Sequence, residues 1–320
     1  MSEGNVKGFE DTENKRCIRL QFDLPIISRL RERKRRKLYY LGLVGPELHD
    51  IQDWKQHLAK DVMTAEEDED YDWKIGRMHS VGSAIGFDVR VLRGEIEHTL
   101  ANGVDVDGEA PLRSSLDSNG YRFFDYDLIN LDFDGGMFHK KVKGIAELLR
   151  RQSRTEFLLM ITFNVRHKMH KELNTAITDL EARLGGTEAA QRVVRWYQGR
   201  PDIYKIKAVV PGIIAAQANH VNLECRAYPP IIYYGKENAK LVHFVFHLKP
   251  HDNVLRGLAT QSEAQLLGLP SLLVSRAVLE LDSEQAPDYN EDAARQSLAF
   301  LNERRIDAIV NSAAQSGRAS

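Results

Sequence analysis

The residues best suited to chemistry stand at the end of an apolar stretch, in the segment Tyr126–Gly136, YDLINLDFDGG. Asp132 and Asp134 are one residue apart there, after Asn130 and before two glycines. One carboxylate in such a place can accept a proton from a reacting group. Two carboxylates could instead hold Mg²⁺ through their oxygens. The residue types leave both kinds of chemistry open.

The residues before these carboxylates indicate how they are positioned. Leu128, Ile129 and Leu131 form a short continuous apolar run, which is typical of a strand covered on both faces by helices. In open α/β sheets, ligands bind in the crevice beyond the carboxyl ends of the strands. We therefore expect the site at the end of this strand.

Similar apolar runs alternate with helical patterns along the chain and predict an α/β fold. We expect further strands at Leu38–Val44, Arg77–Gly82, Phe87–Ile96 and Phe157–Val165. Leu48, Ile51, Trp54, Leu58 and Val62 recur at helical spacing after Gly45-Pro46, and a second helix is expected over His139–Gln152. Two late extended runs, Ala227–Gly235 and Ala239–Pro250, predict an antiparallel hairpin. The sheet is thus expected to be mostly parallel and mixed, with helices on both faces.

The composition is that of an ordinary globular protein. The chain has 320 residues, is 42% hydrophobic and 28% charged, and has a formal net charge of -2, so general attraction to nucleic acid is excluded. Cys17 and Cys225 lie far apart, and the polar first residues lack the apolar core of a signal peptide, which favours the cytoplasm. No apolar stretch is long enough to span a membrane.

The organisation expected from these patterns has four parts. Residues 1–16 are polar and are predicted to be a flexible tail, and residues 17–37 form an amino-terminal extension with a short strand or cover and an entering helix. The α/β domain covers residues 38–250. A carboxy-terminal helical extension covers residues 251–320.

This order of elements resembles the class I S-adenosylmethionine-dependent methyltransferases, whose Rossmann-like sheet closes with a hairpin after five parallel strands. The resemblance covers residues 38–250. In it, LYYLGLVGPE is the first strand with the cofactor turn, and YDLINLDFDGG is the fourth strand. Within the superfamily the chain looks most like the bacterial three-Cys-motif partner methyltransferases. The resemblance implies that S-adenosylmethionine is bound by Gly42, Gly45, Glu47, Glu95 and Asp132. It also implies that Asp132 and Asp134 are catalytic, with the acceptor near Asp132 to Gly136 and Asn164.

The chain departs from the family pattern at two places. The turn after the first strand has Gly42 and Gly45 where the family usually has three glycines, and the expected second strand at 77–82 ends without the acidic residue that usually binds the ribose. Glu47, Asp50 or Asp53 could substitute. The departures support an alternative, a non-catalytic interaction subunit with a protein partner in a bacterial nucleic-acid-related or anti-phage defence system.

Three other features have a functional and a structural interpretation. Seven of the nine residues in Arg29–Lys37 are basic, which suits either a solvated helix face or contact with nucleic acid. Several histidines could bind zinc if the fold assembled them, or could be hydrogen-bonded singly: His167, His170, His243, His247 and His251. Aromatic residues near the hairpin, Tyr228, Tyr233 and Tyr234 beside Pro229-Pro230, could stack on a nucleobase or pack at a sheet edge.

Overall fold

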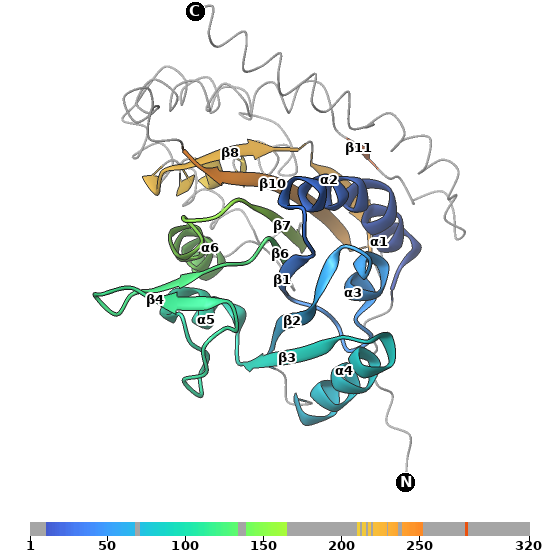
Figure 1. Ribbon diagram of the computed structural model, residues 1–320. Coiled ribbons are helices and arrows are strands. Elements are labelled where there is room, and N and C mark those ends of the chain that lie inside the picture. The colour runs from blue at the N-terminus through green and yellow to red at the C-terminus, as the bar shows by residue number, and fades with distance from the viewer. Residues whose placement is uncertain are drawn as a thin grey trace, which may run out of the picture.

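A nine-stranded mixed sheet forms the centre of the computed structural model (Figure 1). The structure describes residues 11–67, 71–133, 139–164, 220–228, 230–235, 239–251 and 279–280, together with a few positions between 210 and 218. Along the sheet the order is β11-β9-β10-β7-β6-β1-β2-β3, and β8 pairs with β10 beside this path. The predicted α/β fold with a mixed sheet is confirmed.

Five strands of the sheet run parallel to one another. They are β1 Leu38–Gly42, β2 Leu58–Glu66, β3 Asp88–Arg93, β6 Leu128–Asp132 and β7 Phe157–Asn164. The late strands include the predicted antiparallel hairpin: β8 Leu223–Ala227, β9 Ile231–Tyr234 and β10 Lys240–Pro250, with β11 Leu279–Glu280 parallel to β9. A separate small hairpin pairs β4 Ser114–Leu116 with β5 Arg122–Phe124.

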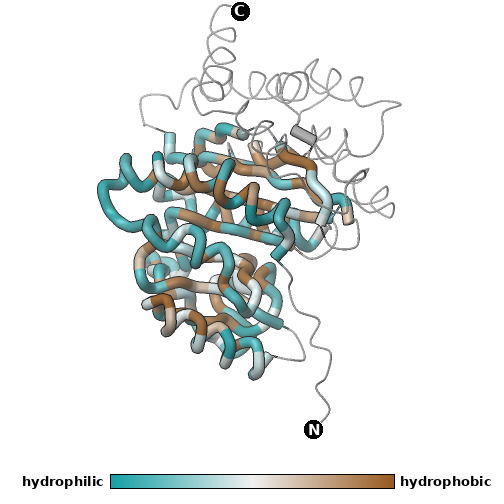
Figure 2. The backbone as a smooth tube through the Cα atoms, turned by 90° about the vertical axis from the view of Figure 1, so that its right-hand side faces the viewer, coloured by the Kyte–Doolittle hydropathy of each residue, from teal (hydrophilic) through white to brown (hydrophobic). Residues whose placement is uncertain are grey.

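Helices cover both faces of the sheet. They are α1 Glu13–Cys17, the π-helical segment η1 Ile18–Asp23, α2 Leu24–Lys34, α3 His49–Trp54, α4 Tyr71–Ile85, α5 Ile96–Asn102 and α6 His139–Arg151. In Figure 1, α5 and α6 lie to the left of the central strands, whereas α1 and α3 lie to the right. The tube in Figure 2 shows brown, hydrophobic stretches running through the middle of the molecule between teal, hydrophilic ones.

Alternation along β1 explains the two layers. Leu38 and Tyr40 belong to the hydrophobic cluster that contains α2 and α3, and Leu41 belongs to the cluster that contains α5 and α6. Successive side chains of a strand point to opposite faces. An apolar strand can therefore hold helices on both sides, which is the burial that the sequence pattern of this strand predicted.

Two predicted elements near the amino-terminal half of the sheet are wrong. The helix after Pro46 ends at Trp54, and Leu58 and Val62 lie on β2; residues 77–82 belong to helix α4 and not to a strand. A spacing of four residues puts side chains on one face of a helix and also on one face of a strand. Leu58 and Val62 are both buried in the same cluster, so their spacing fits either structure.

The amino-terminal region is helical from Glu13 onward. The predicted tail through residue 16 therefore ends earlier, and the short strand expected after Cys17 is replaced by η1 and α2. Residues 1–10 lie outside the described part, as does most of the carboxy-terminal extension expected over residues 251–320. The four-part organisation stays a prediction. Among the described helices, none has both the length and the apolarity needed to cross a bilayer.

Replacing Gly42 by alanine should destabilise the sheet, because the added Cβ would lie 2.6 Å from the carbonyl oxygen of Asn130 and would also meet the ring of Tyr40. We expect Gly42→Ala to lower the free energy of unfolding by about 1–3 kcal/mol, the usual cost of overpacking. Urea unfolding measures it. Gly76→Ala, on α4 with open space around the new methyl group, is the control and should be neutral or stabilising. Equal losses in both variants would contradict this account.

Candidate functional site

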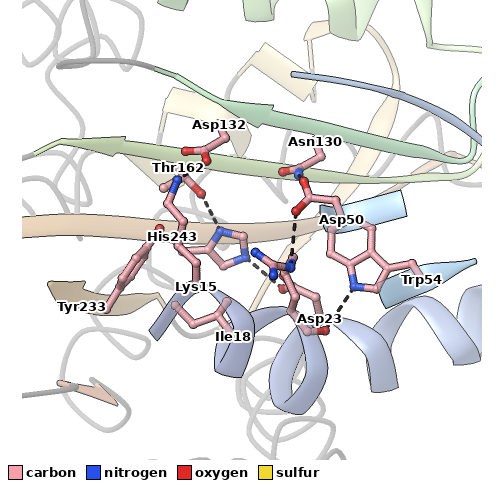
Figure 3. Close-up of a pocket in the computed structure, with 11 residues that line it drawn as sticks. Lys15, Ile18, Asp23, Asp50, Trp54, Asn130, Asp132, Thr162, Tyr233 and His243 are labelled. Atoms are coloured by element: carbon pink, nitrogen blue, oxygen red, sulfur yellow. Dashed lines mark hydrogen bonds and ion pairs between the residues drawn. The ribbon is translucent and has the colours of Figure 1, made fainter. Parts of the chain in front are cut away.

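A small polar cavity lies at the carboxyl ends of β6 and β7 and beside β9 and β10, with the amino-terminal helices on its other side (Figure 3). Its volume is about 30 Å³, which is room for water and far from the roughly 300 Å³ of a small-molecule pocket. The lining side chains are mostly polar or charged: Lys15, Ile18, Arg19, Asp23, Asp50, Trp54, Asn130, Asp132, Thr162, Tyr233 and His243.

Strand register places three of these side chains in a row. Asp132 at the end of β6 is the partner of Thr162 on β7, and Thr162 is in turn the partner of His243 on β10. Partners on paired strands point to the same face of a sheet. The row crosses from the parallel part of the sheet into the antiparallel part, and the amino-terminal helices close over it.

Helix α1 is attached to this edge by an ion pair. The Lys15 ammonium lies 2.6 Å from Oδ2 of Asp132, and the Asn14 side-chain amide donates to the backbone oxygen of Tyr234 at 2.8 Å. The carboxylate of Asp132 raises the pKa of Lys15, so Lys15 stays charged at neutral pH. The cation nearest to the predicted catalytic carboxylate thus comes from a segment that the sequence assigned to the tail.

Arg19 of η1 neutralises a second set of carboxylates. Its guanidinium donates to Asp53 at 2.7 Å and to both oxygens of Asp11 at 2.8 and 2.6 Å, and it lies 3.5 Å from Asp50. The Asn130 amide donates to Asp50 at 2.7 Å. Burial raises the pKa of Asp50 to about 6, although Arg19 opposes the shift. Asp50 is thus a partly protonated carboxyl group near neutral pH.

His243 joins the sheet to η1 in the same cavity. One ring nitrogen, Nδ1, lies 2.8 Å from the Thr162 hydroxyl, and the other, Nε2, lies 2.9 Å from Oδ1 of Asp23. All three residues are buried. Burial alone would lower the pKa of His243, but the charge and hydrogen bond of Asp23 outweigh it and raise the pKa above the usual value. Protonated His243 then donates from both nitrogens.

The structure brings together only part of the predicted site. Asp132 lines the cavity, and Gly42 ends the neighbouring strand with its partner Asn130 on β6. The carbonyl of Gly45 accepts from the Leu48 backbone amide at 2.9 Å and so shapes the turn before α3. Asp134 lies outside the described residues.

Glu47 and Glu95, two other carboxylates predicted to bind the cofactor, form ion pairs with cations away from the cavity. Glu47 accepts from the Arg77 guanidinium of α4 in two hydrogen bonds of 2.8 Å, which lowers the pKa of Glu47. Glu95 immediately precedes α5 and forms an ion pair with Lys140 of α6. The cofactor roles of both residues stay predictions.

An acidic residue ends the true second strand. Glu66 is the last residue of β2, its side chain is 13% exposed, and it accepts from the Lys74 ammonium at 3.1 Å. The sequence interpretation missed it because it placed the second strand at residues 77–82. The segment AKDVMTAE before Glu66 carries a recognisable apolar run, and a shorter helix after Pro46 would have revealed the strand.

The histidines in the described part of the chain do not gather into one group. His243 bonds Thr162 and Asp23, whereas His247 lies 2.7 Å from Glu156. Within the described ranges no set of three or more His, Cys, Asp or Glu side chains is arranged to hold a metal ion. His167 and His170 lie outside those ranges.

The aromatic residues near the hairpin pack inside the protein. Tyr233 is buried and lines the cavity, and Tyr228 meets the ring of Phe22 edge-on with centroids 6.5 Å apart. Their packing favours the structural interpretation for these two side chains. Pro229 lies outside the described residues.

The order and direction of the strands identify the fold. The parallel strands β3-β2-β1-β6-β7 are followed in the sheet by antiparallel β10 and then β9. This is the class I methyltransferase fold. No protein-family model matches the chain, and no curated protein matches its sequence.

The solved structures with a similar arrangement are distant. An O-methyltransferase from Bacillus cereus in complex with SAH is 12% identical, with a TM-score of 0.39, over 74% of this chain and 82% of its own. The N-methyltransferase NodS from Bradyrhizobium japonicum, also with SAH, is 11% identical, with a TM-score of 0.37, over 76% and 90%. An rRNA methylase from Streptococcus thermophilus is 11% identical, with a TM-score of 0.33, over 67% and 89%. Similarities this weak say nothing about activity or substrate.

The raised pKa of His243 predicts how stability depends on pH. A group that holds its proton more tightly in the folded state stabilises the fold fully below its unfolded pKa of about 6.5, and this contribution is lost as pH rises through the folded pKa. Urea unfolding should therefore give a lower free energy at pH 8.5 than at pH 6.5. Asp23→Asn should reduce this slope, whereas Asp107→Asn, at an exposed carboxylate, should keep it. An unchanged slope in Asp23→Asn would contradict the assignment.

Proposed function

We propose that the protein is an S-adenosylmethionine-dependent methyltransferase, with an acceptor that approaches the carboxyl ends of β6 and β7. The observation that carries the proposal is Glu66, the acidic residue at the end of β2. The family usually has an acidic residue at the end of its second strand, and Glu66 supplies one. Glu66 lies next to the Gly42 turn, because Thr64, two residues before Glu66, is the register partner of Gly42. A carboxylate there is suited to accept hydrogen bonds from ribose hydroxyls.

The residues that would hold the cofactor fit it in part. Glu66 and Glu95 supply carboxylates beyond β2 and β3, but each is paired with a lysine, Lys74 or Lys140, that cofactor hydroxyls would have to displace. The turn from Gly42 to Glu47 would face the methionine part. When bound, S-adenosylmethionine supplies a methyl group on a positively charged sulfur.

Asp132 is the residue we propose to act on the acceptor. Methyl transfer needs an aligned nucleophile and, for a protonated acceptor, a base. Asp132 stands at the strand end with its side chain 33% exposed, and Lys15 is its ion-pair partner. Helix α1 and η1 partly cover this end of the strands. They also occupy the approach, so an acceptor that reaches Asp132 must displace Lys15.

The contacts that hold the amino-terminal helices over the cavity also favour a second candidate function. The ion pairs of Lys15 and Arg19 fix the amino-terminal helices over a cavity of only about 30 Å³. A chain that keeps the fold but fills the substrate side would suit a non-catalytic interaction subunit, with a protein partner in a bacterial nucleic-acid-related or anti-phage defence system. Under this alternative the ion pairs are permanent structural contacts.

Calorimetric titration tests the cofactor proposal directly. S-adenosylhomocysteine, which cannot transfer a methyl group, should bind the purified chain, and Glu66→Gln should weaken binding about tenfold or more because a charged acceptor contributes about 1.5–3 kcal/mol. Glu67→Gln is the control at the adjacent exposed carboxylate and should bind like the unmodified chain. Absence of binding to the unmodified chain at millimolar ligand would refute the proposal.

The ion pair of Lys15 distinguishes the two candidates. If the amino-terminal helices move to admit ligands, Lys15→Met should speed amide hydrogen exchange in α1 and change the affinity for S-adenosylhomocysteine. If they are a permanent cover, the variant should lower the melting temperature and leave that affinity unchanged. Arg16→Met, which removes an exposed charge from the same helix, is the matched control and should leave both readouts unchanged.

A further inference from the structure

Part of the basic run Arg29–Lys37 is held in place at the amino ends of the parallel strands, opposite the candidate site. Asp127 is fully buried just before β6. Its oxygens accept from Arg36 at 2.6 Å and lie 3.2 Å from the Lys34 ammonium, and it also accepts from the Tyr39 backbone amide at 2.9 Å. A buried charge retains its partners strongly. The basic residues at the end of α2 and just after it are thereby anchored to the sheet and held in one orientation.

Arginine guanidiniums at this end of the sheet lie over aromatic rings. The guanidinium carbon of Arg113 is 3.5 Å from the ring centroid of Tyr39, and that of Arg36 is 4.4 Å from the same ring. The guanidinium carbon of Arg154 is 3.4 Å from the centre of Phe123. Such contacts hold a guanidinium as an oriented planar group.

The contacts of Arg113 and Arg154 lie near each other at the small hairpin. Arg113 directly precedes β4, and Ser115 on β4 is the register partner of Phe123 on β5, so the two stacks lie within a few residues of each other across the small hairpin. The carbonyl of Arg113 accepts from the Asp125 amide at 2.8 Å, two residues before the buried Asp127 that holds Arg36. We call Arg31, Arg35, Arg36, Arg113 and Arg154 the arginine edge.

The arginine edge is accessible and positive. Arg31, Arg35 and Arg154 are exposed, and the Arg113 side chain is 37% exposed. Burial lowers the pKa of neighbouring His57, and the positive charges of Lys37 and Arg31 lower it further. The acidic side chains at this end of the sheet include Glu32 in the run, exposed Asp125 and Asp88, Glu156, which is 3.1 Å from Arg33, and Asp61, which is 3.8 Å from Arg113. Cations therefore predominate locally, although the whole chain has a formal net charge of -2.

We propose that the arginine edge binds single-stranded nucleic acid. Exposed Arg31 and Arg35 supply charge for phosphates, which dominate such affinity. The guanidiniums of Arg113 and Arg154 present planes on which unpaired bases stack, an interaction that a duplex with its bases already stacked cannot make. This surface lies at the other ends of the strands from Asp132, so the inference stands or falls independently of cofactor binding.

Fluorescence anisotropy with labelled 20-nucleotide single-stranded RNA, single-stranded DNA and the matching DNA duplex tests the proposal. We expect either single strand to bind at least fivefold more tightly than the duplex at low salt. The Arg31→Gln/Arg35→Gln variant should weaken binding and flatten the dependence of log affinity on log salt by about 0.7 for each phosphate that the variant no longer neutralises. The charge-matched control is Arg90→Gln/Lys143→Gln, two exposed cations elsewhere, which should bind normally.

A charge-preserving pair of variants tests the stacking. Arg154→Lys keeps the charge but removes the planar group, so single-strand affinity should fall about fivefold or more with the salt dependence unchanged. Arg150→Lys, an exposed neighbour on α6, should have no effect. Failure of both single strands to bind, equal affinity for the duplex, or equal weakening in the Arg31/Arg35 variant and its charge-matched control would each overturn the proposal.

Discussion

The placement of β6 between β1 and β7 is the constraint on which the other features depend. All three strands are buried on both faces, so polar groups gather at their ends, where side chains are no longer covered by helices. The carboxyl ends collect Asn130, Asp132 and Thr162, and the amino end of β6 collects Asp127. The candidate methyltransferase site and the arginine edge are thus two consequences of one packed, apolar arrangement.

Charge balance explains why the amino-terminal helices belong to the site. Partly buried carboxylates at the carboxyl ends require cations, and α1 and η1 supply them as Lys15 and Arg19. His243, held by Asp23 of η1, ties the same segment to β10. Opening this edge to a ligand would require new partners for all of these groups. The proposed catalytic and non-catalytic functions differ in whether that exchange takes place.

The sequence predicted the structure best where a hydrophobic pattern fitted only one kind of element. The continuous apolar runs of β1, β6 and β7 predicted buried parallel strands, and the late runs predicted the hairpin of β9 and β10. The pattern failed at Leu58 and Val62, because a spacing of four residues suits a helix and a strand equally. That error displaced the second strand and hid Glu66, the residue that now best supports the cofactor proposal.

The sequence by itself determined the fold class and the end of the sheet where polar groups meet, since both follow from local hydrophobic patterns; the role of Asp132 there stays a prediction. Only the tertiary structure showed that Lys15 pairs with Asp132, that His243 lies between Thr162 and Asp23, and that Asp127 anchors the basic run. These pairs join residues separated by 81 to 220 positions. A charged residue carries no local signal of a distant partner, because its pairing arises only when strand register and helix packing bring the two together.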